Sequence, residues 1–290
     1  MENLEPISTL KENPLKKYFR QPKMYVELPS KGEFYATGSL EISETGEYAV
    51  YAMTARDEMM MRTPDALLNG ESTVQLIRSC VPSILDPWSM PTIDLDVILV
   101  AIKVASYGNN MDIKVKTPVT KEEKTYQLDL MNVLSQFSTI NYNNIINLEN
   151  FVIRLKPLTY REFTEVSKKT FEEQRIFSLM NKTDIDESER LAKFNQSFKK
   201  LTELNVTTLK KSIESVEIEG DLVTEESYIS EFIDNVERSV FESVLKHIDQ
   251  EKKKFSLKPM TIQATPEEIE QGVPETYEIP VSLDQSNFFV

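Results

Sequence analysis

The chain has 290 residues, of which 40% are hydrophobic and 28% are charged, so it is long enough to bury the core of one large domain or two modest ones. Its 33 basic and 47 acidic residues give a net charge of −14, which argues against nucleic acid and anionic membranes as its main partners. One cysteine and one histidine exclude an intramolecular disulfide, a cysteine zinc site and a site with several histidine ligands, and no glycine-rich phosphate-binding motif occurs.

The first fifty residues predict an arm followed by two strands. Residues 1–23 are polar and contain three prolines, a composition typical of an extended arm. Strands are expected at residues 24–28 and 48–53, where apolar and aromatic residues stand beside turns that contain glycine. This stretch has no basic-then-apolar signal peptide, so we expect a soluble protein of a reducing compartment.

Residues 63–91 combine four prolines with the single cysteine and the single tryptophan of the chain. Turn and capping chemistry accounts for most of this density, because Thr63 and Pro64 suit a helix start and Gly70 suits a helix end. Ser72 is expected to cap a further short helix. Taken residue by residue, the stretch predicts short packed elements rather than an active site.

The best-defined helix of the first half is expected at residues 93–106. It is apolar on nearly every face, with acidic residues at its start and Gly108 after its end, which indicates a buried helix too short to span a membrane. A hairpin is expected at residues 111–130, where apolar and polar side chains alternate on both sides of a turn, and a strand at 151–155. These elements predict a small mixed α+β domain over residues 24–157.

Residues 158–257 contain no proline and a single glycine, Gly220, and they predict a mainly helical segment. The sequence from Thr159 to Glu162 is a capping box that opens its first helix. Apolar residues then recur every three or four positions, which predicts the amphipathic helices of a bundle; each stripe is expected to face a core, with a partner-binding face as the alternative. The stripes are Leu191, Phe194, Phe198 and Leu201; Val206, Leu209 and Ile213; and Val236, Val240, Val244 and Ile248.

Residues 258–290 predict an acidic, extended C-terminal arm that docks on this protein's own N-terminal domain or on a neighbouring subunit. The last thirty residues contain six acidic and no basic residues, so the receiving groove should be neutral or basic. Tyr277 and Ile279 alternate with polar residues, as in an edge strand with one apolar face, and Phe288 and Phe289 would anchor the arm. The alternative is a disordered acidic tail.

An ordered series of motifs resembles the baseplate hub family of T4-like contractile-tailed bacteriophages, most strongly over residues 18–130. The fold class expected from the residues, α+β with an extended C-terminal arm, is compatible with this resemblance. The motifs are Leu28 to Gly32 (LPSKG), Tyr51 to Glu58 (YAMTARDE), Thr63 to Gly70 (TPDALLNG), Ile84 with Asp86 to Trp88 (DPW), Pro91, Asp94 to Asp96 (DLD), and the terminal Phe288 and Phe289.

The resemblance implies a non-enzymatic structural protein of the tail baseplate, located in the virion and assembled in the host cytoplasm. Its partners would be other phage baseplate or tail proteins, with no catalytic residue, cofactor or metal, and no nucleic acid or membrane. Members of the family often carry cysteine pairs of the zinc-binding kind in their hairpins; here Thr117 to Thr120 occupy that turn, so we expect a hairpin without metal. The residues expected to bind partners are Trp88, Tyr277, Ile279, Phe288 and Phe289.

Two alternatives stay open at this point. The first is a transient assembly chaperone that is absent from the mature virion. The second is a metal-dependent hydrolase that uses carboxylates, because Asp94 with Asp96, and the run from Asp184 to Glu187, are spaced acids. A pair of acids near a helix start more often complements the helix dipole, which favours the structural interpretation.

Overall fold

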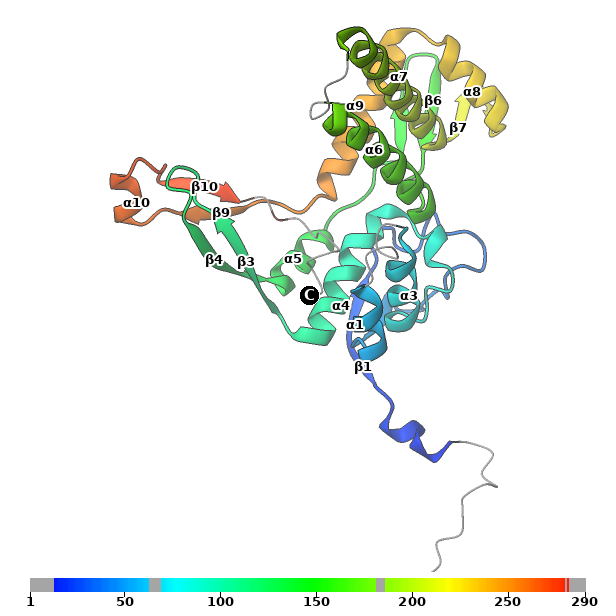
Figure 1. Cartoon of the computed structure of the whole chain (residues 1–290). Helices are drawn as coiled ribbons and strands as arrows, with labels where there is room; N and C mark the ends of the chain where they lie inside the picture. Colours follow the sequence, from blue (N-terminus) through cyan, green and yellow to red (C-terminus); the bar gives the residue numbers. More distant parts are fainter. Residues whose placement is uncertain (1–12, 63–68, 181–185, 280, 282–290) are drawn as a thin grey trace, which may run out of the picture.

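The computed structural model describes residues 13–62, 69–180, 186–279 and 281, and it shows the α+β fold predicted from the sequence. Figure 1 shows three parts: a lobe around the helix α4, a second lobe that contains α6 to α9, and a pair of hairpins set to one side. The motif segments before residue 63 and from Gly70 to Asp96 belong to the first lobe. Residues 63–68, where a helix start was expected, lie outside the described residues.

The first lobe is built around one buried helix, as predicted. Nearly all of the apolar residues in the first half of α4 are buried, and the helix packs against a two-stranded antiparallel sheet. A 3-10 turn at Thr92–Asp94 precedes it. Gly70, which adopts the left-handed backbone conformation, directly precedes the α3 helix. Ser72 was expected to cap this helix, but its hydroxyl instead donates a hydrogen bond to the Met60 carbonyl. The elements are β1 (Pro22–Glu27), β2 (Glu47–Tyr51), α1 (Ala55–Met61), α3 (Glu71–Cys80), α4 (Leu95–Tyr107) and α5 (Leu130–Phe137).

The second lobe differs from the predicted helical segment, because residues 158–257 contain two strands. The strands β7 (Ile213–Ile218) and β8 (Asp221–Val223) continue a four-stranded antiparallel sheet in the order β5-β6-β7-β8. Glu219 and Gly220 both have positive φ, the conformation that a tight two-residue hairpin turn requires. Ile213, expected on a helix face, therefore begins β7. The first two strands are β5 (Ile145–Asn147) and β6 (Phe151–Leu155).

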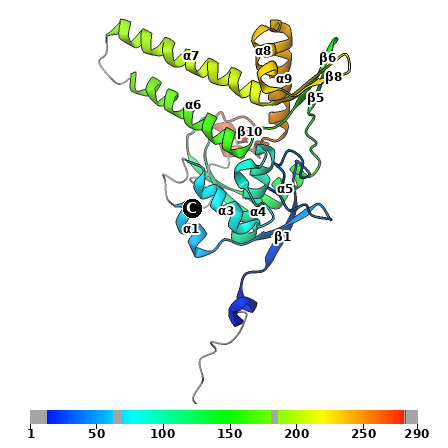
Figure 2. The ribbon, with the colours of Figure 1, turned by 90° about the vertical axis from the view of Figure 1, so that its right-hand side faces the viewer.

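Four helices complete the second lobe. The predicted capping box is formed, since the Glu162 carboxylate accepts from the Thr159 backbone N–H at 3.0 Å. Val244 and Ile248 pack in the core of this lobe as expected. Figure 2 shows that α6 and α7 form a long pair that projects from the body. The helices are α6 (Tyr160–Met180), α7 (Glu187–Lys211), α8 (Glu226–Asn235) and α9 (Arg238–Lys254).

Contrary to the expectation of a core-facing stripe, the apolar stripe on the first half of α7 is largely exposed in the part of the chain that the structure describes. Leu191, Phe194 and Phe198 are 60%, 47% and 61% exposed. The helical period alone predicts an apolar face, but only packing decides whether another element covers it. In this half of the helix Ser197 is the one buried residue, and it faces Glu173 of α6.

The third part consists of two hairpins that lie far apart in the sequence and side by side in space (Figure 1). The predicted hairpin is present as β3 (Asn110–Lys116) and β4 (Glu123–Asp129). The C-terminal segment is less extended than expected, because β9 (Met260–Gln263) and β10 (Thr276–Ile279) pair around the short helix α10 (Pro266–Glu270).

An arm projects from the first lobe (Figure 1). It contains the 3-10 turn Pro14–Tyr18, whose Leu15 and Tyr18 are exposed together with the following Phe19. Arg20 fastens the arm to the lobe, since its guanidinium donates to the carbonyls of Ala52 and Ser79.

Candidate partner-binding surfaces

The motif segments of the first lobe are held to one another by hydrogen bonds. The LPSKG and DLD segments meet where the buried Asp94 carboxylate accepts from the Ser30 backbone N–H at 2.8 Å and from the Ser30 hydroxyl at 2.6 Å. The Tyr35 hydroxyl donates to the same carboxylate at 3.0 Å. The order of these segments in the sequence therefore reflects one packed structure.

Asp94 and Asp96 do not form a common metal site. Asp94 turns toward Ser30 and Tyr35, whereas Asp96 lines a separate cavity of about 350 Å³ between the first two lobes. Burial raises the pKa of each carboxyl to about 6. Asp186 caps α7 through the Ser188 N–H, and Asp184 lies outside the described residues. Across the described part of the chain, no three His, Cys, Asp or Glu side chains come close enough to hold a metal ion.

Trp88 joins two lobes of this chain. Its indole stacks on the Tyr160 ring at 5.6 Å between centroids, and the Arg161 guanidinium lies over the indole, 5.0 Å from its ring centroid. Asp86 fixes the turn before it by accepting from the Trp88 N–H. Trp88 was expected to bind a partner protein, and its contacts here are with the first turn of α6.

Tyr277 and Ile279 also make contacts within the chain. Both are buried in a small cluster that includes Val115 and Tyr126 of the β3-β4 hairpin. The hydroxyls of Tyr126 and Tyr277 are 2.6 Å apart, and the Lys124 ammonium lies 2.7 Å from the Glu268 carboxylate. The β9-β10 hairpin is thereby fastened to the β3-β4 hairpin. Phe288 and Phe289 lie outside the described residues.

Replacing Tyr277 by alanine should release the β9-β10 hairpin from its support. Burying such an aromatic ring is worth roughly 1.5–3 kcal/mol, so amide exchange of residues 260–279 should accelerate about tenfold or more. Hydrogen-exchange mass spectrometry measures this directly, and Tyr277→Phe, which keeps the ring, is the matched control. Unchanged exchange in the alanine variant would contradict the docking role of this side chain.

The turn where the resemblance suggested cysteine pairs is closed by ordinary hydrogen bonds. The Thr117 N–H and hydroxyl both donate to the Glu122 carbonyl, at 2.9 and 3.0 Å. Thr117 is buried and Val119, near the tip, is exposed. The contacts described between the two hairpins are the apolar cluster with β9 and β10, the Tyr126–Tyr277 hydroxyl pair and the Lys124–Glu268 ion pair.

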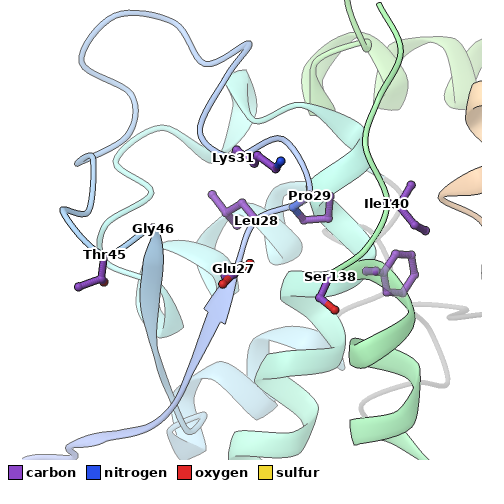
Figure 3. A pocket seen from close by; sticks show the side chains of 9 residues that line it. Glu27, Leu28, Pro29, Lys31, Thr45, Gly46, Ser138 and Ile140 are labelled. Carbon is purple, nitrogen blue, oxygen red and sulfur yellow. The ribbon is translucent and has the colours of Figure 1, made fainter.

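A cavity of about 270 Å³ opens where β1 ends, beside the start of β2 and the end of α5 (Figure 3). The LPSKG motif supplies part of its wall. The charged side chains on this wall are Glu27 and Lys31, and Thr45 and Ser138 add hydroxyl groups to an otherwise apolar lining. Its lining residues are Glu27, Leu28, Pro29, Lys31, Thr45, Gly46, Phe137, Ser138 and Ile140.

Comparison with known proteins identifies the family. A family model described as T4 bacteriophage base plate protein matches residues 21–270, which cover most of the chain and end before β10. The chain belongs to this family. A search of curated proteins and a search of solved structures each returned no match.

Membership in the base plate family gives the protein a structural role in the phage baseplate, as a component of the tail that contacts other tail proteins. The resemblance expected from the motif series is confirmed at this level. Within the part of the chain that the structure describes, no helix combines the length and apolarity needed to cross a bilayer.

The sequence interpretation missed that several large apolar side chains on the helices of the second lobe are exposed. The stripe Leu191, Phe194 and Phe198 on α7 was assigned to a core, and the exposed Tyr228 on α8 was not singled out. The heptad-like spacing on α7 was the available signal. A family that works through protein contacts draws attention to such exposed apolar faces.

Proposed function

We propose that this protein is a baseplate hub component that remains in the virion and acts in tail assembly through contacts with other baseplate proteins. The observation that carries the proposal is the family match over residues 21–270, together with the hub-type motif series that runs through the first lobe. The exposed arm and the exposed face of α7 support a role in binding proteins.

The protein acts without catalysis, cofactor or metal in this proposal, and it assembles in the host cytoplasm. The separation of Asp94 and Asp96 into different surroundings supports a structural role for both. The net charge of −14 supports protein partners over nucleic acid or membranes. Phe288 and Phe289 are proposed as anchors for a partner, while Trp88, Tyr277 and Ile279 contribute by holding the surrounding lobes in place.

Quantitative mass spectrometry of purified virions tests the proposal against the chaperone alternative. A hub component should be present at a fixed copy number relative to other baseplate proteins, and a nonsense mutant should yield tails that lack a baseplate. If the mutant fails to assemble baseplates while wild-type virions contain none of this chain, the protein is a transient chaperone instead.

A further inference from the structure

The junction of the first two lobes contains the cavity of about 350 Å³ that Asp96 lines. Its wall is mainly apolar and combines residues from the start of α4, from α6 and from α9. Ile93, Leu158 and Phe255 on this wall are buried, yet none of them belongs to the apolar core of either lobe. A cavity of roughly 150 Å³ holds a benzene molecule, so this junction cavity has room for a bicyclic aromatic ring.

Asp96 is the acidic side chain among the lining residues, and it lies in the first turn of α4. In the part of the chain that the structure describes, no donor lies within hydrogen-bond distance of its carboxylate. Burial raises its pKa to about 6, so at pH 7.5 the carboxylate is ionised and can only accept hydrogen bonds. A buried carboxylate without a donor is costly, so this site favours a ligand that brings a polar hydrogen to Asp96.

Two lysines, Lys156 and Lys252, stand at the rim of the junction cavity, where both are exposed to solvent. Neither takes part in an ion pair among the described residues. Phe163, which is 43% exposed, adds an aromatic ring to the same rim. The two positive charges oppose the entry of a cationic ligand and favour a negatively charged group near the opening.

We propose that the junction cavity receives a tryptophan or tyrosine side chain of a partner protein, from a position that is flanked by acidic residues. The ring fills the apolar part of the cavity, its N–H or O–H donates to the Asp96 carboxylate, and the flanking acids lie against Lys156 and Lys252. Such side chains often anchor protein interfaces, because they bury a large ring and keep one polar hydrogen. A lysine or arginine side chain would also bring a donor to Asp96, but the rim lysines repel it.

The inference rests on the proposed function for the source of this side chain, since a baseplate component contacts other tail proteins. Binding to the purified protein is measured apart from baseplate assembly, so either idea can fail while the other holds.

Ligand-observed NMR titration of the purified full-length protein with indole-3-propionate at pH 7.5 tests the cavity. This probe carries an indole ring, one N–H and one carboxylate, and we expect a dissociation constant of about 1 mM or below. Its N-methyl analogue keeps the ring and the charge but lacks the polar hydrogen, so it should bind about tenfold more weakly. Absence of binding at about 5 mM, or equal affinity for the two probes, would overturn the proposal.

Substitutions assign the two polar contacts. In Asp96→Ala the preference for the probe with the N–H should disappear, because the acceptor is gone; a preference that persists would show that the probe binds elsewhere and would overturn the proposal. Lys252→Gln should weaken binding of indole-3-propionate about threefold and leave binding of neutral indole unchanged. Lys253→Gln, which changes an exposed lysine of the same helix outside the cavity, is the matched control and should affect neither probe. Thermal unfolding verifies that each variant is folded, and the comparison of the two probes on the wild type requires no variant.

Two further probes identify the kind of ligand. Tryptamine, which replaces the carboxylate by an ammonium group, should bind about tenfold more weakly than indole-3-propionate because the rim is positive. Tighter binding of tryptamine would show that the site selects a basic group and would overturn the proposal. A capped tripeptide with tryptophan between two aspartates should bind at least as tightly as indole-3-propionate. Binding of the free acid without binding of the peptide would assign the cavity to a small aromatic acid and would overturn the assignment to a partner protein.

Discussion

Replacing Arg20 by alanine is expected to lower the free energy of unfolding by about 3 kcal/mol, because a buried carboxylate loses its cation. The guanidinium lies 3.6 Å from the carboxylate of Asp57, whose side chain is only 5% exposed. It also donates to the Ser79 hydroxyl at 2.8 Å and to the Ala52 and Ser79 carbonyls. The substitution therefore leaves the Asp57 carboxylate without its cation and removes the donor to the Ala52 and Ser79 carbonyls. It also releases the N-terminal arm from the first lobe.

Urea unfolding of Arg20→Ala, Arg20→Lys and Asp57→Asn, singly and combined, measures this effect. Lysine keeps the charge but lacks the planar fork that reaches the carbonyls and the carboxylate together, so Arg20→Lys should recover only part of the loss. The loss from Arg20→Ala should be smaller in the Asp57→Asn background, because no buried charge is then left unpaired. Equal losses in both backgrounds would show that Asp57 is not the partner that matters.

The second large effect is expected from Asp94→Ala, which should cost about 3 kcal/mol of unfolding free energy at pH 5. Three donors lose their acceptor, namely the Ser30 N–H, the Ser30 hydroxyl and the Tyr35 hydroxyl, and each stranded buried group costs about 1 kcal/mol or more. Asp94→Asn retains an acceptor oxygen and should cost about half as much. If Asp94→Ala lowers the free energy of unfolding by less than about 0.5 kcal/mol, the site repacks without these hydrogen bonds.

The cost of Asp94→Ala should also depend on pH. Burial raises the pKa of Asp94 from 3.8 to about 6, so the folded protein binds this proton more tightly than the unfolded chain does. Stability from this group is complete below about pH 4 and is lost as the pH rises through 6. Between pH 5 and pH 7.5 the wild type loses stability because Asp94 ionises, whereas the alanine variant lacks this group. The difference in unfolding free energy between the two proteins should therefore shrink by about 1.5 kcal/mol over this pH range. Asp96, whose pKa is also about 6, titrates in both proteins and cancels in the comparison.

Local periodicity was sufficient to predict the elements that bury one face or all faces. The buried helix α4 followed from apolar residues on every side, and the β3-β4 hairpin followed from alternation around a turn. The strand β7 was missed because Ile213 continues the helical spacing of Val206 and Leu209, while its pairing with β6 is a long-range contact. Sheet pairing of this kind can override local propensity.

The site was harder to predict than the fold, because exposure depends on what lies opposite. Phe194 and Phe198 have the spacing of a core stripe, and nothing local distinguishes a covered face from an open one. Trp88 and Tyr277 were expected to bind partners, whereas the contacts described for them are with Tyr160 and Tyr126 of the same chain. The sequence indicates that such an aromatic residue is buried in a contact, but it does not reveal whether the contact is with the same chain or with another protein.

The pairing of the β3-β4 and β9-β10 hairpins limits the order in which the parts of this protein can fold during translation. The side chains of Val115 and Tyr126 stay uncovered until Ile262 and Tyr277 have been synthesised. The two tyrosines are separated by 151 positions in the sequence. The second lobe lies between them in the sequence, so it is synthesised before the hairpins can join. A polypeptide that stops before residue 277 would leave Tyr126 uncovered, and the joined hairpins would thus distinguish a finished chain from a prematurely terminated one.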